Sequence, residues 1–149
     1  MMEHTDLLLA ILHHGLAFGL VGLLWMEMAL VRPGLRRADL PALARVDAAY
    51  GAGAGLLVLV GIGRLLFGLK GWEYYVTNDA FWTKMAAFAA IGLLSIKPTR
   101  TILRWRRSES GEAVAVAEIE ALRRWLKLEL LLFFVVIACA AAMARGYGA

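Results

Sequence analysis

The stretch LLLAILHHGLAFGLVGLLWMEMALV, residues 7–31, decides the fold because it is apolar almost throughout and contains no lysine or arginine. It is longer than the roughly 20 residues that a helix needs to cross the hydrocarbon core of a bilayer. Three further apolar stretches follow at 47–69, 81–96 and 126–144. The 149 residues are 61% hydrophobic with a mean hydropathy of +0.68, whereas roughly 45–50% apolar residues is usual in soluble domains. We therefore predict an all-α integral membrane four-helix bundle that forms a single domain, 1–149.

Basic residues in the connecting loops predict the orientation. The loops 32–46 and 97–125 are rich in arginine, whereas loop 70–80 holds one lysine, two acids and three aromatic residues. The positive-inside rule places the arginine-rich loops in the cytoplasm, so both termini lie outside a bacterial inner membrane. The net charge of +4 does not indicate nucleic acid, because the arginines flank apolar spans rather than alternating with stacking aromatics. The expected environment is the lipid bilayer.

Short helical extensions are expected on the cytoplasmic side. Asp39 resembles a helix N-cap, which predicts a short interfacial helix leading into the second span. Ser110 or Gly111 begins a further helix that is too long for the membrane alone, so its first turns project into the cytoplasm. The GxxxG pair Gly15 and Gly19, and the run GAGAG at 51–55, favour close helix contact. That contact lies either within one chain or between the protomers of a homo-oligomer.

Ionisable residues inside the spans form two layers, of which the outer one holds His13, His14, Arg64 and Lys84. A neutral imidazole can ligate a metal such as haem iron, and two cations at the same depth can neutralise haem propionates. The pattern predicts a site for haem b or a related tetrapyrrole, with electron transfer as its function; a quinone is another candidate partner. Adjacent histidines diverge by about 100°, so they cannot ligate opposite faces of one haem. Alternatively, these side chains bond neighbouring helices or reach the headgroups.

The inner layer comprises Glu27, Asp47, Tyr50, Lys127 and Glu129. Helical spacing places Glu27 on the same face as His13, and Arg64 on the same face as Tyr50, so a polar face linking both layers is expected. A small proton-coupled transporter would use that face. The carboxylates could bind a cation, but pairing with Arg32, Arg45 and Lys127 is the simpler interpretation. A non-enzymatic helix-packing module is the third alternative, and no hydrolase or nucleotide motif supports an enzyme.

Several sequence motifs occur in this order along the chain: EMALVRPGL (27–35), RVDAAYG (45–51), GIGRLLFGLKGWEYY (61–75), FWTKM (81–85) and GLLSIKPTRTILRWRR (92–107). In order and spacing they resemble a family of predicted bacterial four-helix membrane proteins, the domain of unknown function twenty-two fourteen. The resemblance covers nearly the whole chain. It implies the four-helix membrane fold and no particular activity.

A more distant likeness concerns the first three spans. An early histidine in the first, an arginine in the second and a tryptophan closely followed by a lysine in the third are similar to the small membrane protoporphyrinogen oxidases of haem biosynthesis. This likeness implies functional roles for His13 or His14 and for Lys84. Those oxidases usually carry a histidine in the third-helix motif, where this chain has Trp82, Thr83 and Lys84.

Overall fold

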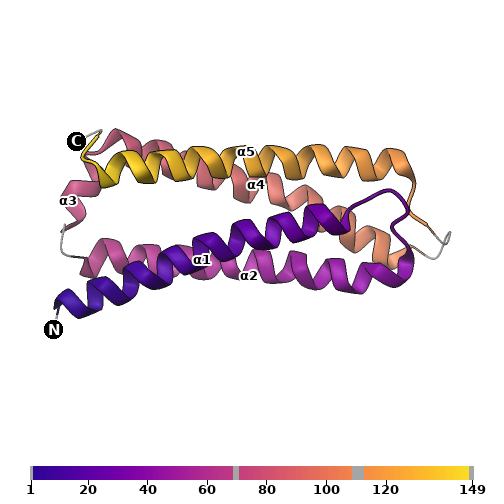
Figure 1. The fold of residues 1–149 in the computed structure, drawn as a ribbon, viewed down its shortest axis with the longest axis horizontal. Helices are drawn as coiled ribbons and strands as arrows, with labels where there is room; N and C mark the ends of the chain where they lie inside the picture. Colours follow the sequence, from indigo (N-terminus) through magenta and orange to yellow (C-terminus); the bar gives the residue numbers. More distant parts are fainter. Residues whose placement is uncertain (1, 69–70, 109–112, 148–149) are drawn as a thin grey trace.

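Four long helices form the molecule (Figure 1). The computed structural model describes residues 2–68, 71–108 and 113–147. Its elements are α1 (Met2–Leu30), the 3-10 turn η1 (Arg37–Asp39), α2 (Leu40–Phe67), the short α3 (Gly71–Val76), α4 (Asp79–Arg107) and α5 (Val116–Ala144). Four helical segments are long and apolar enough to cross a membrane: His4–Leu30, Arg37–Phe67, Asp79–Arg107 and Val116–Ala144. The predicted all-α fold with four membrane-length helices is confirmed.

The bundle consists of two antiparallel helix pairs, α1 with α2 and α4 with α5 (Figure 1). Contacts between the pairs are sparser and run mainly between α2 and α4. Both termini and α3 lie at one end of the bundle, which we call the terminal end. The α1–α2 connection and the start of α5 lie at the other, which we call the basic end because arginines 32, 36, 37, 104, 106 and 107 gather there.

The residues before the predicted second span are helical, as expected, but they form the start of α2 rather than a separate interfacial helix. Helix α2 begins at Leu40, directly after the single turn η1, and continues without a break into the apolar region. Asp39 does occupy the N-cap position, but its side chain accepts a hydrogen bond from the Arg36 N–H at 3.3 Å rather than capping α2. Pro41 lies in the first turn of α2, where its missing N–H costs no helical hydrogen bond.

The other connections also differ in detail from the prediction. Loop 70–80 contains α3, which packs against both α2 and α4. The predicted helix starts Ser110 and Gly111 lie outside the described residues, and α5 begins at Val116. All four long helices thus begin before the apolar spans predicted from the sequence, and α4 also ends after its span.

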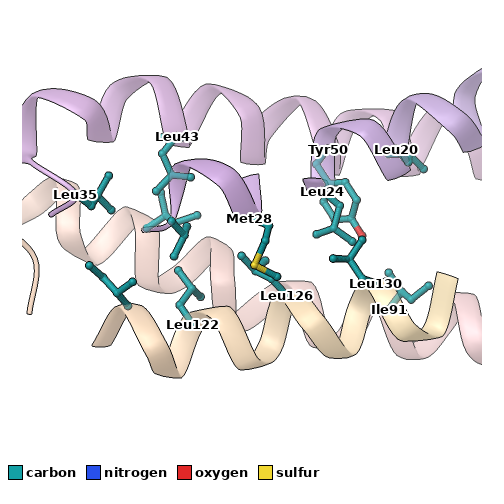
Figure 2. Close-up of a cluster of buried hydrophobic side chains, with 14 of the residues drawn as sticks. Leu20, Leu24, Met28, Leu35, Leu43, Tyr50, Ile91, Leu122, Leu126 and Leu130 are labelled. Carbon is teal, nitrogen blue, oxygen red and sulfur yellow. The ribbon is translucent and has the colours of Figure 1, made fainter. Parts of the chain in front are cut away.

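The buried apolar core occupies the half of the bundle nearer the basic end (Figure 2). Its fully buried members include Leu20, Leu24, Leu43, Ile102, Leu126 and Ile119. Towards the terminal end this packing stops on α1 and α2, whereas Ala87 of α4 and Met143 of α5 are still buried. No described side chain of α1 before Leu20 is buried, and none of α2 after Leu57 is buried. The two helix pairs are therefore joined by a close-packed core in one half and are loosely packed in the other.

Arg123 of α5 links this helix to the end of α1 at the basic end of the bundle. Its Nη1 donates hydrogen bonds to the carbonyl oxygens of Met28, at 2.9 Å, and Val31. These carbonyls belong to the last turn of α1 and to the residue after it. The last carbonyls of a helix have no N–H donor within the helix, and the helix dipole favours a positive charge there. The Val114 N–H also donates to the Leu35 carbonyl at 3.1 Å. The Arg123 bonds join α5 to the end of α1, and the Val114 bond joins the residues before α5 to the α1–α2 connection.

Glycine allows α1 and α2 to approach each other at Gly53, which belongs to the predicted GAGAG run, and not at the predicted GxxxG pair Gly15 and Gly19. A Cβ added at Gly53 would lie 3.0 Å from Leu20 Cδ2, and one at Gly61 would lie 3.5 Å from His13 Cε1. A Cβ added at Gly15 or Gly19 would have no neighbour within 4 Å. These two glycines line an open apolar groove together with Gly53. Contact between protomers through that groove stays a prediction.

Candidate functional site

Three of the four predicted outer-layer residues converge between the helices near the terminal end. His13 comes from α1, Arg64 from α2 and Lys84 from α4, and all three are partly buried. The positive charges of Arg64 and Lys84 both act on the His13 ring, and they act on each other. We call His13, Arg64 and Lys84 the terminal layer. Gly61 of α2 lies next to the ring, because a Cβ added there would be 3.5 Å from His13 Cε1.

Two polar atoms of the terminal layer lack partners. His13 Nδ1 and Arg64 Nε are both buried without a hydrogen bond to any described residue. Such groups lose their hydration without compensation unless something else bonds them. Lys84 is better satisfied, because its Nζ lies 5.4 Å from the centroid of the Phe81 ring. The layer therefore offers unused hydrogen-bonding and ligating capacity towards the interior.

His14 does not share this environment. Its side chain is exposed on the bundle surface, and its Nδ1 lies 2.6 Å from the Ala10 carbonyl oxygen of the same helix. The His13 and His14 rings are 6.2 Å apart between centroids and nearly perpendicular, at 86°. The two side chains leave α1 in different directions, as expected of consecutive helical residues. Of the two histidines, only His13 faces Arg64 and Lys84.

The second layer lies nearer the basic end and is almost completely buried. Glu27, Asp47, Tyr50 and Glu129 are 1%, 7%, 4% and 0% exposed, respectively. The Tyr50 hydroxyl donates to Glu129 Oε2 at 3.0 Å, and the Thr99 hydroxyl donates to Asp47 Oδ1 at 2.7 Å. Glu27 Oε1 and Glu129 Oε1 have no partner among the described residues. We call this group the carboxyl layer.

The predicted salt bridges of this layer are wrong. Across the described residues the ion pairs are Arg36–Asp39 and Arg104–Glu118, both at the surface of the basic end. Arg32, Arg45 and Lys127 are exposed instead. The reason is helical geometry, because a basic residue two positions before an acid, as at 45 and 47 or 127 and 129, points to the opposite side of the helix.

The predicted polar face linking the two layers is also wrong. Leu20 and Leu24 lie on α1 between His13 and Glu27, at spacings that place them on the same face, and they are 1% and 0% exposed. Leu57 of α2 and Ile91 of α4 are buried in the same apolar core. Figure 2 shows Leu20 and Ile91 on the side of Tyr50 towards the terminal end, and Leu24 beside Tyr50. Apolar side chains thus separate the terminal layer from the carboxyl layer.

Comparison with known families agrees with this architecture. The model of the family described as "Predicted membrane protein (DUF2214)" matches residues 5–148. The chain belongs to this family. No curated protein and no solved structure matches it. The DUF2214 description supports a multi-pass membrane protein and assigns no activity, so function in this DUF2214 chain must be argued from its two polar layers.

Sequence reasoning missed two contributors to these layers of the DUF2214 chain. Thr99 follows Pro98 in α4 and supplies the hydroxyl bonded to Asp47. A hydroxyl in an apolar helix is a weak signal, because it can equally bond its own backbone, as Ser95 does with the Gly92 carbonyl. Gly61 was missed because it lies next to the His13 ring of another helix, and the sequence of one helix does not show that contact.

The donor set restricts what the terminal layer can bind. Among the described residues no three or more His, Cys, Asp or Glu side chains are arranged to hold a metal ion. A metal held by protein side chains alone therefore lacks a ready set of ligands here. A tetrapyrrole brings its own four nitrogens and needs only one or two axial ligands from the protein. A single interior histidine beside two cations fits that requirement.

Proposed function

We propose that the terminal layer binds haem b or a related tetrapyrrole, and that this membrane protein serves in electron transfer. His13 is the axial ligand, and Arg64 and Lys84 hold the carboxylates of the macrocycle. One observation carries the proposal: a histidine and an arginine, each with a buried nitrogen that has no partner among the described residues, meet a lysine from a third helix where α1 and α2 bury no side chain. Bound haem would supply one-electron chemistry.

The loose packing of the terminal half supports a flat apolar ligand. Leu9, Leu16 and Ala17 of α1 are only partly buried, although they lie on the side of α1 that faces the bundle. A macrocycle between the helix pairs would bury these side chains and complete a core that otherwise ends near Leu20. With His14 at the surface, each chain contributes one interior histidine.

The two rival functions have less support. In a helix-packing module the polar residues should bond neighbouring helices, yet His13 Nδ1 and Arg64 Nε bond none of the described residues. A proton-coupled transporter needs a polar route between the layers, and Leu20 and Leu24 interrupt it. The terminal layer is better suited to a bound ligand than to either role.

An absorption spectrum of the detergent-purified protein tests the haem proposal. We expect a b-type spectrum after dithionite reduction and a pyridine haemochrome assay near one haem per chain or per dimer. His13→Ala should abolish the spectrum, whereas the matched control His14→Ala should retain it. A colourless protein that also fails to take up added haem would refute the proposal. Loss of the spectrum in His14→Ala alone would refute the choice of ligand.

We also propose that the protein resides in a bacterial inner membrane with its basic end in the cytoplasm. The arginines of that end support this orientation, because basic residues are retained on the cytoplasmic side. Alkaline phosphatase fused after residue 149 should then be active and a green fluorescent protein fusion dark, since the first folds in the periplasm and the second in the cytoplasm. The reverse pattern would place the terminal layer in the cytoplasmic leaflet.

A further inference from the structure

At the carboxyl layer all four long helices each contribute a buried or partly buried polar side chain to a shared cluster. Glu27 comes from α1, Asp47 and Tyr50 from α2, Thr99 from α4 and Glu129 from α5. The acidic side chains act on one another electrostatically: Asp47 and Glu129 both act on Glu27, and Asp47 acts on Glu129. The cluster is independent of the proposed haem site, because buried leucines lie between the two layers.

No cation neutralises this cluster among the described residues. Arg123 of α5 is directed to the Met28 and Val31 carbonyls, and Lys97 of α4 lies over the Trp125 ring at 4.9 Å from its centroid. Arg45 and Lys127 are exposed. Three ionised carboxylates would thus be like charges held together, out of water, inside an apolar bundle. That state is strongly unfavourable in a membrane interior.

The hydrogen bonds show the same imbalance. The layer contains two hydroxyl donors, from Tyr50 and Thr99, and these serve Glu129 and Asp47. Glu27 receives no hydrogen bond although it is 1% exposed, and Glu129 Oε1 has none either. The group is short of donors rather than of acceptors. A proton on a carboxyl oxygen removes one negative charge and adds one donor, so it corrects both deficits at once.

We propose that Glu27, Asp47 and Glu129 form a proton-binding site that holds protons at neutral pH. Each proton converts one carboxylate to a carboxylic acid, and Glu27, which lacks any other donor, is its central member. The buried side chains of Leu20 and Leu24 separate this site from the terminal layer. A metal ion is a poorer occupant, since no group of ligands suited to one is found among the described residues.

Infrared spectroscopy of the full-length protein in lipid nanodiscs tests the proposal directly. At neutral pH we expect a C=O band from protonated carboxyl groups that shifts in heavy water. Glu27→Gln should remove part of that band, and Asp47→Asn and Glu129→Gln should each remove a further part. The matched control is Glu120→Gln, an exposed acid on α5, which should leave the band unchanged. Absence of the band in the wild-type protein at neutral pH would refute the proposal without any variant having to fold.

A sodium test separates protons from a bound monovalent cation. At equal ionic strength, replacing sodium by choline should leave the thermal unfolding temperature and the carboxyl band unchanged. A stabilisation that requires sodium and disappears in Glu129→Gln would overturn the proton assignment in favour of a cation site. A variant band identical to that of the wild type for all three acids would also overturn it, because the protonated groups would then lie elsewhere.

Discussion

The two halves of this bundle differ in how tightly apolar side chains pack around their buried polar groups. Near the basic end, the carboxyl layer is enclosed by a close-packed core, and Arg123 bonds the end of α1. Near the terminal end, His13 and Arg64 face an interior in which few side chains are buried. Dense packing around the acids agrees with the proposed binding of protons, and looser packing around a histidine and two cations agrees with the proposed binding of a tetrapyrrole. The comparison therefore contrasts a stabilising half with a half that is proposed to bind a ligand.

Removal of core volume should give the largest difference between the halves. Leu24→Ala opens a cavity in the basic half and should lower the free energy of unfolding by about 3 kcal/mol. Leu12→Ala, at a position 53% exposed on α1, should change it by less than about 0.5 kcal/mol. Unfolding in mixed detergent micelles measures both values. Equal losses would mean that packing is uniform along the bundle and would break the comparison.

Arg123 should contribute the next largest effect. Arg123→Ala leaves the Met28 and Val31 carbonyls without their charged donor and should cost about 2 kcal/mol of unfolding free energy. Arg124→Ala removes the same charge from an exposed neighbour and provides the control. Hydrogen exchange at the end of α1 should increase only in the first variant. Similar losses in both would indicate a general effect of charge rather than the two bonds.

The fold was predictable from hydropathy, whereas the pairing of polar residues was not. Apolar runs long enough to span a bilayer give the helices, and spacing along α1 correctly separates His13 from His14. The error at Arg45 came from counting proximity in sequence, although a residue two positions from Asp47 faces the other way. Thr99 and Gly61 act across helices, and one sequence does not say which faces of two helices meet. The difference in packing between the two halves likewise depends on which helix faces are in contact.

The hydroxyl donors of the carboxyl layer should have smaller effects. Tyr50→Phe removes the donor to Glu129, and Thr99→Val removes the donor to Asp47. Each should lower the free energy of unfolding by about 1 kcal/mol. Ser95→Ala is the control, because that hydroxyl bonds only the Gly92 carbonyl of its own helix. Unchanged stability in both test variants would mean that the acids find other donors and that the layer is less enclosed than the core around it.

Glycine-to-alanine changes should give the smallest effects and compare the two halves on one helix. Alanine favours a helix by up to about 1 kcal/mol over glycine, so Gly61→Ala should raise the free energy of unfolding by about 0.5 kcal/mol. Its Cβ would make ordinary contact with His13 Cε1 at 3.5 Å. At Gly53 the Cβ would lie 3.0 Å from Leu20 Cδ2, and Leu20 is only 1% exposed, so it has little room to move. Gly53→Ala should therefore gain nothing, because crowding offsets the helical preference. An equal gain at both positions would show that Leu20 yields freely and that the basic half is no tighter than the terminal half.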